Sequence, residues 1–402
     1  PMQATVMRTE NVETEQPSAP GPATPEPRPG PPDPDASPQR LTIAQWKGHL
    51  AEFEKPSVWR ATLQIVDTLG PYLLLWYLMY LSLDVSWWLT VPLAMLAGLL
   101  LIRIFIIFHD CGHGSFFRSR LANDTTGFIA GLLTLTPYYH WRWEHGLHHA
   151  TAGDLDRRGI GDVWTMTVQE YLESSRWRRF SYNLARNPFV LFVIAPVFLF
   201  VFRQRLPSRR ASPRERHSVW WMNLAIAVMA VTLGLSFGWL PYLFIQLTVT
   251  AVAGAAGVWL FYVQHQFEDA YWERGDNWDY TVAALQGSSY YELPAVLRWL
   301  SGNIGFHHVH HLSSRIPNYN LARCHASHPS FRDVKPVTLM GGWRSIFLKL
   351  WDERHGELVG FRKARARGRE VKAPEEGCRD GEAREPGASA VGEQRKDRRA
   401  AL

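Results

Sequence analysis

Four segments of this chain are long and apolar enough to cross a lipid bilayer, and they constrain its fold more than any other feature. A membrane-spanning helix needs about 20 mostly apolar residues, because the hydrocarbon core is about 30 Å thick. The predicted spans are residues 62–82, 87–108, 219–238 and 240–264. The short linkers SLDVS and FGWLP join these spans in two pairs, so we predict an all-α integral membrane protein with four transmembrane helices in two hairpins.

A fifth apolar run, NPFVLFVIAPVFLFVF (residues 187–202), is short for a span and contains Pro196. We interpret it as an interfacial or re-entrant helix rather than a fifth crossing. Arginines crowd the long loop between residues 109 and 218, whereas neither hairpin linker carries Lys or Arg. By the positive-inside rule, the loop and both termini are expected on the cytoplasmic side, and the linkers outside.

The two ends of the chain differ in composition from the middle. Residues 1–40 are rich in Pro and small polar residues, and residues 362–402 mix charged residues and Gly without apolar periodicity. Neither end can bury enough apolar surface to offset the entropy of ordering, so both are predicted to be disordered tails. Residues 41–361 are left as the folded membrane domain.

Charge and cysteine content exclude two classes of protein. Three cysteines, Cys111, Cys324 and Cys378, are too few and too scattered for a disulfide framework. The net charge of +6 could suggest nucleic-acid binding, but the arginines lie beside apolar segments, as at a membrane surface. We therefore expect no nucleic-acid partner.

Most of the 16 histidines fall into three clusters. The first is the pair His109 and His113, the second is HGLHH (His145, His148 and His149), and the third is HHVHH (His307, His310 and His311). On a helix, positions i, i+3 and i+4 share one face, so each cluster can direct all its imidazoles at one point. The predicted topology places all three clusters just beyond the cytoplasmic ends of the spans.

This pattern predicts a metal centre rather than scattered surface or core histidines. Eight imidazoles are too many for one ion, since zinc takes four ligands and keeps one position open when it is catalytic. Two ions are the simplest solution. Imidazole suits Fe, Zn, Cu and Ni, so the type of ligand leaves the metal open.

The three clusters resemble the histidine boxes of the membrane-bound fatty acid desaturases. HDCGH, HGLHH and HHVHH match the HxxxH, HxxHH and HxxHH boxes in order, in spacing and in position relative to the spans. The resemblance covers about residues 41–361 and includes HHATAGDLDRRGIGDVWTMT, WLFYVQHQFEDAYW and GNIGFHHVHHLSSRIPNYNL, which look like bacterial acyl-lipid desaturases of the Δ5 and ω-6 type.

The resemblance implies the fold, the chemistry and the location of the enzyme. It implies interfacial helices and a cytoplasmic helical cap that carries the boxes, in a bacterial cytoplasmic membrane. It further implies a histidine-bound pair of iron ions, O₂ as co-substrate, and insertion of a cis double bond into the acyl chain of a membrane lipid. The position of the double bond and the substrate head group stay open.

The same resemblance adds His265, which spacing alone would leave as a lone histidine. The expected metal ligands are therefore His109, His113, His145, His148, His149, His265, His307, His310 and His311. No catalytic residue beyond these ligands and no separate cofactor-binding residue is expected. By helical spacing, His308 points away from the face that His307, His310 and His311 share, so it is left out. His140 is a candidate for a hydrogen-bond partner of a ligand histidine.

Acidic residues near the boxes have two possible roles. Ligand histidines usually donate their second N–H to a carboxylate, a carbonyl or water. The candidate carboxylates are Asp110, Glu144, Asp154, Asp156, Asp162 and Glu268. Each could instead cap a helix or pair with Arg157 or Arg158. Cys111 lies inside the first box but points off its face, and we expect it to be a packed thiol.

Two alternatives to a desaturase remain. A hydroxylase or other monooxygenase could use the same diiron scaffold. A membrane zinc hydrolase would need about three protein ligands and would leave most clustered histidines unexplained.

Electrons must come from outside the chain, because it contains neither an HPGG haem motif nor a GxGxxG after a strand. A ferredoxin with its reductase is expected ahead of cytochrome b5, docking on arginines between residues 157 and 216.

Overall fold

A computed structural model of the chain describes residues 43–370. The predicted tail 1–40 lies outside these residues, as does the part of the C-terminal tail beyond residue 370. The folded domain continues past its predicted end at residue 361, because helix α17 (Phe361–Glu370) follows there. Arg367 of α17 donates hydrogen bonds to Asp352 and Glu357, which ties this helix to the preceding strands.

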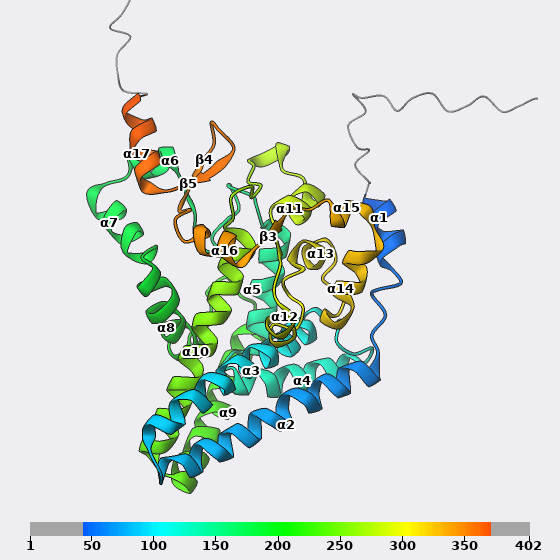
Figure 1. Cartoon of the computed structure of the whole chain (residues 1–402), viewed down its shortest axis with the longest axis vertical. Coiled ribbons are helices and arrows are strands. Elements are labelled where there is room, and N and C mark those ends of the chain that lie inside the picture. The colour runs from blue at the N-terminus through cyan, green and yellow to red at the C-terminus, as the bar shows by residue number, and fades with distance from the viewer. Residues whose placement is uncertain (1–42, 371–402) are drawn as a thin grey trace, which may run out of the picture.

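Four helices are long and apolar enough to cross a membrane: α2 (Val58–Leu83), α3 (Trp87–His113), α9 (Pro213–Phe237) and α10 (Trp239–His265). They confirm the four predicted spans and their pairing in two hairpins, so the chain is an all-α membrane protein. The two hairpin linkers lie at the same end of the molecule, where the rings of Tyr80 and Phe237 are 4.8 Å apart (Figure 1).

All four spanning helices are longer than the predicted spans, and in α3 and α10 the difference matters for the site. Helices α3 and α10 each have 27 residues, where 22 and 25 residues had been assigned to the spans 87–108 and 240–264. Such helices are about 40 Å long, which exceeds the hydrocarbon core of a bilayer by about 10 Å. Their last turns carry His109, His113 and His265 beyond the apolar part of each span.

Helix α3 is the central span and packs against α2, α10 and α4 (Arg120–Leu133). A Cβ atom at Gly98 would lie 2.7 Å from Val252, so glycine permits the close approach of α3 and α10. Arg103 is buried in α3, where it donates to Thr68 and to the Trp299 carbonyl and lies 3.6 Å from Asp67. These contacts fasten α12 (Ala295–Leu300) to the spans.

The fifth apolar run forms the π-helical turn η1 (Val190–Ile194), α8 (Ala195–Val201) and η2 (Arg203–Arg205), bent by 60° from α7 (Arg176–Ala185). Before this run, Arg186 donates to Gln266 at the end of α10, at 3.0 Å. After it, the Ser208 N–H donates to His140 Nε2, at 2.9 Å. Both ends of the run therefore lie at the histidine-bearing end of the spans, which agrees with a re-entrant or interfacial segment.

The remaining elements form a cap over that end of the spans (Figure 1). Its helices are α1 (Ile43–Leu50), α5 (Tyr138–Thr151), α6 (Val168–Glu173), η3 (Gly275–Asn277), α11 (Tyr280–Gln286), α12, α13 (His307–Leu312), α14 (Asn318–Ser327), α15 (Pro329–Arg332), α16 (Leu339–Ser345) and α17. A separate core of the cap packs Trp46, Val309, Ile316 and Phe331 together.

Two small sheets brace the cap and were not predicted. Strand β4 (Leu350–Asp352) pairs in parallel with β1 (Met166–Thr167) and antiparallel with β5 (Glu357–Val359). Strand β2 (Tyr290–Tyr291) pairs in parallel with β3 (Pro336–Val337). Each strand has only two or three residues, too few for an alternating pattern to be visible in the sequence.

Candidate metal centre

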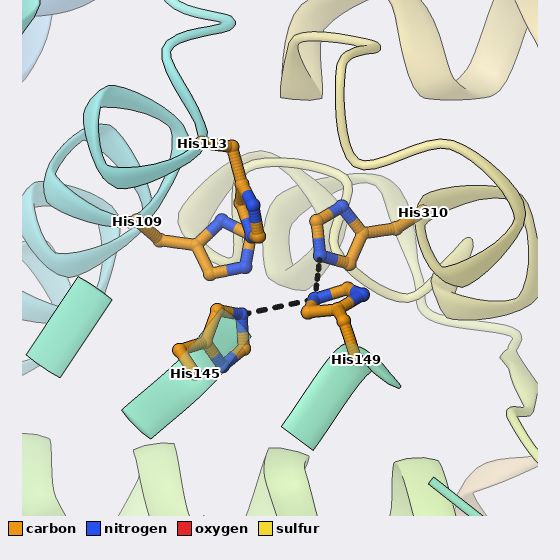
Figure 2. A group of neighbouring side chains, drawn as sticks. All are labelled: His109, His113, His145, His149 and His310. Carbon is orange, nitrogen blue, oxygen red and sulfur yellow. Dashed lines mark hydrogen bonds between the residues drawn. The ribbon is translucent and has the colours of Figure 1, made fainter. Parts of the chain in front are cut away.

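Nine histidines converge between the ends of two spans and two cap helices. Helix α3 contributes His109 and His113, α5 contributes three residues, α10 contributes His265, and α13 contributes three more. They form two groups: His109, His113, His145, His149 and His310 in the first (Figure 2), and His148, His265, His307 and His311 in the second. Within each group, one ring nitrogen per residue lies within 4.8 Å of all the others.

These two groups contain all nine histidines that the sequence singled out, but not in the predicted arrangement. Each HxxHH cluster was expected to direct its imidazoles at one point, and that prediction is wrong. In α5, His145 and His149 join the first group while His148 turns to the second. In α13 the division is reversed, since His310 joins the first group and His307 and His311 the second. Each cluster therefore connects the two groups.

Ring nitrogens within the groups lie within hydrogen-bond distance of one another. In the first group, His149 Nε2 is 3.1 Å from His145 Nε2 and 3.0 Å from His310 Nε2 (Figure 2). In the second, His265 Nε2 is 3.1 Å from His148 Nε2 and 3.0 Å from His307 Nε2. Nitrogens at this spacing could share one metal ion, because metal–imidazole bonds are about 2.0–2.1 Å long. The spacing thus fits two shared metal ions.

The protonation state of the imidazoles fits as well. Burial, together with neighbouring imidazoles, holds the pKa values of His145, His149, His307, His310 and His311 well below the ordinary value for histidine. These side chains are therefore neutral at pH 7, which is the form that binds metals.

Five ring nitrogens in the groups lack hydrogen-bond partners among the described residues: the Nδ1 atoms of His149, His307 and His310, and the Nε2 atoms of His113 and His311. A buried polar atom rarely stays unsatisfied, and a metal ion in each group would satisfy His113 Nε2 and His311 Nε2.

Two of the six candidate carboxylates orient histidines. Asp110 Oδ1 lies 3.0 Å from His109 Nδ1, and its Oδ2 accepts hydrogen bonds from the backbone N–H and side-chain amide of Asn318, at 2.6 and 2.8 Å. Asp162 Oδ1 lies 2.5 Å from His148 Nδ1. A carboxylate at Nδ1 fixes the tautomer that leaves Nε2 free for a metal. Each carboxylate serves a different group.

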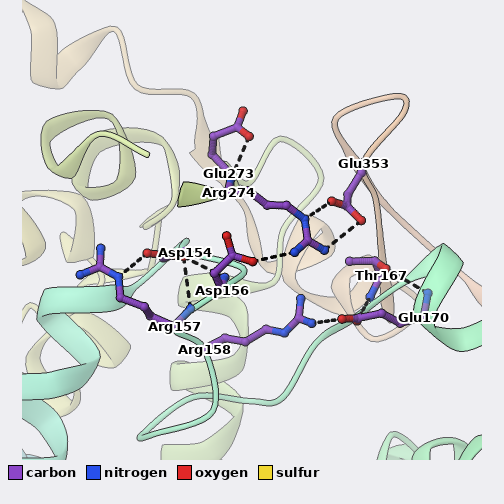
Figure 3. A network of polar contacts seen from close by, with 9 residues as sticks. All are labelled: Asp154, Asp156, Arg157, Arg158, Thr167, Glu170, Glu273, Arg274 and Glu353. Atoms are coloured by element: carbon purple, nitrogen blue, oxygen red, sulfur yellow. Dashed lines mark hydrogen bonds and ion pairs between the residues drawn. The ribbon is translucent and has the colours of Figure 1, made fainter. Parts of the chain in front are cut away.

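The other four carboxylates do not contact the clustered histidines. Asp154 pairs with Arg157, and Asp156 accepts from Arg274 at 2.6 Å (Figure 3). These two residues follow the salt-bridge alternative, although Asp156 pairs with an arginine that the sequence did not suggest. The last two are Glu144, which lies 3.6 Å from His140 Nδ1, and Glu268, which lines a separate cavity of the cap.

Three further sequence expectations concern residues beside the groups. His308 lies outside both groups, as its phase predicted, and its Nε2 is 3.1 Å from His325 Nδ1. Cys111 is fully buried as an unpaired thiol, as expected. His140 binds the Ser208 N–H and contacts neither group, so it anchors a loop instead of supporting the metal site.

Three residues at the site were missed by the sequence reasoning. Asn318 positions Asp110 from 208 residues away, and the Gly287 carbonyl lies 3.3 Å from His265 Nδ1. The Trp141 ring stacks on His145, with centroids 4.4 Å apart. Only Trp141 had a sequence signal, because it precedes His145 by four residues and so shares its helix face.

Replacing Asp110 or Asp162 by asparagine should weaken metal binding by about 10- to 100-fold, because the amide cannot hold the same tautomer as firmly. Titration of the purified, metal-depleted variants with metal would measure this loss. The matched control is Asp156→Asn, which removes an exposed carboxylate paired with Arg274 and should bind metal like the unmodified protein. Equal weakening in all three variants would contradict the assigned roles of Asp110 and Asp162.

Comparison with known proteins agrees with this geometry. A family model described as fatty acid desaturase matches residues 86–338, a range that includes all nine histidines. A protein of Bacillus subtilis named fatty acid desaturase is 46% identical over 313 residues, which cover 78% of this chain and 89% of the relative.

Two cyanobacterial relatives from Synechocystis sp. are more distant. One, named sn-1 acyl-lipid omega-3 desaturase (ferredoxin), is 27% identical over 66% of this chain and 75% of its own length. The other, named sn-1 oleoyl-lipid 12-desaturase, is 29% identical over 68% of this chain and 77% of its own length.

Proposed function

The chain belongs to the fatty acid desaturase family, whose members are oxidoreductases, and on this premise we propose that it is an O₂-dependent desaturase of membrane lipids. It would insert a cis double bond into the acyl chain of a glycerolipid. The observation that carries this proposal is the pair of histidine groups held at the ends of two spans, where an acyl chain leaves the bilayer. The names of the two cyanobacterial relatives support an acyl-lipid substrate.

Iron fits the two groups better than zinc. The first group offers five nitrogens, one more than a tetrahedral zinc site takes. Zinc also has no redox chemistry, so it could not assist a reaction with O₂.

The reaction removes one hydrogen from each of two neighbouring methylenes and leaves a carbon–carbon double bond. With two electrons and two protons from outside, the reaction reduces O₂ to two molecules of water. A pair of iron ions, when bound, supplies the oxidising power needed for unactivated C–H bonds. The nine histidines would hold these ions.

The remaining tasks fall to other parts of the chain. Asp110 and Asp162 hold His109 and His148 in the ligating tautomer. The cap covers the site from water, since His307, His310 and His311 are each at most 2% exposed. Exclusion of water protects a reactive oxidant from side reactions.

One experiment tests the proposal and its alternatives together. We expect purified protein to contain about two iron ions per chain, and expression in a host without desaturases to produce unsaturated acyl chains in membrane lipids. Metal analysis and gas chromatography of the fatty acids would measure these results. Hydroxylated acyl chains would instead indicate the monooxygenase, and bound zinc without any altered acyl chain would indicate the hydrolase.

We further propose that the metal centre faces the cytoplasm of a bacterial cell. In a parent variant with Cys378→Ser, cysteines at Val85 or Leu240 in the hairpin linkers should react with an impermeant thiol reagent added to intact cells. A cysteine at Arg209 should react only after the cells are opened, because Arg209 adjoins the histidine-bearing end through Ser208. All three side chains are exposed. Labelling of Arg209→Cys in intact cells would overturn this orientation.

We also propose a separate electron donor, with an acidic ferredoxin preferred because a cyanobacterial relative carries ferredoxin in its name. The docking surface for this donor was expected between residues 157 and 216, and the structure reduces the number of arginines that could form it. Arg157 and Arg158 pair with Asp154 and Glu170, so their charges are compensated (Figure 3).

Helix α7 is also a poor dock, because its exposed Trp177, Phe180 and Leu184 are typical of a helix lying in a membrane surface. The remaining exposed arginines are Arg203, Arg209, Arg210, Arg214 and Arg216, but Arg203 donates to the Leu206 carbonyl and Arg214 lies over the Tyr139 ring. Arg209 and Arg210 lie just before α9 and Arg216 in its first turn, and none of the three forms an ion pair within the described residues. Helix α9 packs against α5. We therefore propose that the donor docks on residues 209–216.

A further inference from the structure

A cavity of about 1170 Å³ lies in the cap beside the second histidine group. Its inner lining is apolar and includes Phe267, Val282, Leu285, Val334, Val337 and Leu348. Gln286 and Ser288 also line it, and the residue between them, Gly287, has its carbonyl 3.3 Å from His265 Nδ1. The segment 286–288 therefore lies between the cavity and the second histidine group.

Helix α16 lines this cavity and lies beside the end of the spanning helix α10. The Tyr262 hydroxyl, one turn before His265 in α10, donates to the carbonyls of Ser345 and Leu348 at 3.1 and 2.8 Å. These contacts place α16 at the level of the last turn of a span, where the bilayer surface lies.

The outer side of α16 is apolar. Leu339, Met340, Trp343 and Phe347 of this helix and the residues just after it are 47–61% exposed, an arrangement typical of a helix at the lipid boundary. Met340 also lines the cavity, so the cavity opens next to lipid.

A buried hydroxyl in the cavity lacks a partner. The Ser288 side chain is fully buried, lines the cavity, and its Oγ forms no hydrogen bond with any described residue. Buried polar groups are almost always hydrogen-bonded, so this hydroxyl is available to a polar atom of a ligand in the cavity.

The charged residues of the cavity are of both signs. Four carboxylates line it, from Glu268, Asp269, Asp279 and Asp333, together with the cations of Lys335 and Arg344. Asp269 accepts from Lys335 at 2.6 Å, and Asp279 caps α11 by accepting from the Val282 N–H. The side chains of Glu268, Asp333 and Arg344 form no hydrogen bond or ion pair within the described residues.

We propose that this cavity binds the lipid substrate as a zwitterionic aminophospholipid, an inference that rests on the proposed function. The apolar lining takes part of an acyl chain, the unpaired Arg344 faces the phosphate, and Glu268 and Asp333 face the ammonium group. Because carboxylates outnumber cations here, a head group with net negative charge is disfavoured.

The test uses full-length protein in neutral detergent and two photoreactive lipids that carry a diazirine on the acyl chain. One probe is a phosphatidylethanolamine and the other a phosphatidylglycerol with the same chains. We expect the first to label peptides from residues 281–289 and 334–348, and to do so about fivefold more strongly than the second. Labelling elsewhere, or equal labelling by both probes, would overturn the proposal.

Two sets of variants sharpen the test. Glu268→Gln combined with Asp333→Asn should bring the ratio of labelling by the two probes close to one, because both unpaired carboxylates are lost. Met340→Trp should reduce labelling by filling the cavity from an exposed position, whereas Met95→Trp, exposed on α3 away from the cavity, should not. A labelling ratio that is unchanged in the double variant would contradict the role of the carboxylates.

The two proposals can fail separately. Specific labelling of the cavity without any unsaturated product would support this lipid site and contradict the proposed reaction. Unsaturated products from a protein whose cavity is never labelled would support the reaction and overturn the lipid site. The metal content of each variant, measured in parallel, shows whether the histidine groups are intact.

Discussion

Replacing His149 or His311 by alanine is expected to abolish desaturation while the protein still inserts in the membrane. His149 lies within 3.1 Å of two other ring nitrogens of the first group, and His311 belongs to the second, so each substitution removes a ligand from a different ion. The loss should exceed the roughly 10- to 100-fold expected for the outer carboxylates. Bound iron should fall from about two ions per chain towards one.

The matched controls are His308→Ala and His325→Ala. These two histidines contact each other and belong to neither group, although His308 is as buried as its neighbours. Either change should cost some stability through lost packing but leave the iron content and activity largely intact. An inactive His308→Ala variant beside an active His307→Ala variant would show that the assigned helical phase of α13 is wrong.

Reconstituted enzyme should be inactive with NADPH alone and become active when ferredoxin and its reductase are added. Each O₂ reduced needs two electrons beyond those from the substrate, and no haem, flavin or nicotinamide motif is found in the sequence. Consumption of O₂ and formation of unsaturated acyl chains would measure this. Turnover with NADPH and no added carrier would contradict the proposal of a separate donor.

Charge reversal can locate the dock of this donor. Replacing Arg209, Arg210 and Arg216 by glutamate should raise the ferredoxin concentration needed for half-maximal turnover by about tenfold or more, because opposite charge accelerates the encounter. The effect should shrink as salt is added, since exposed charges are then screened. The matched control reverses Arg157 and Arg158, whose charges are already compensated, and should leave the ferredoxin dependence less affected.

The spans and the identity of the clustered histidines followed from local rules. A run of about 20 apolar residues is long enough to cross a bilayer as a helix, and helical spacing fixes which histidines share a face. That spacing also set His308 apart from His307, as the structure bears out. The ends of elements were harder to predict, because α3 and α10 continue into polar residues that hydropathy alone does not count as span.

Which carboxylates serve the histidines could not be told from distance along the chain. Asp110 and Asp162 contact histidines, whereas Asp154 and Asp156, which are closer in sequence to His148 than Asp162 is, pair with arginines instead. Arg274, the partner of Asp156, lies 118 residues away. Such pairs are set by the folding of loops over one another, and no local pattern encodes them.

Spacing in the sequence predicts eight of the nine histidines that meet, and the family resemblance adds His265, but which group each histidine joins depends on how the helices pack. Histidines spaced i, i+3 and i+4 share one face of a helix, and this spacing alone predicts that each cluster binds a single metal ion. In the folded protein, the histidines of α5 and α13 meet those of α3 in one group and that of α10 in the other, so neighbouring side chains of one helix reach towards different spans. His148 and His149 are adjacent in sequence and yet belong to different groups, because the direction of each side chain is set by the packing of four separate elements.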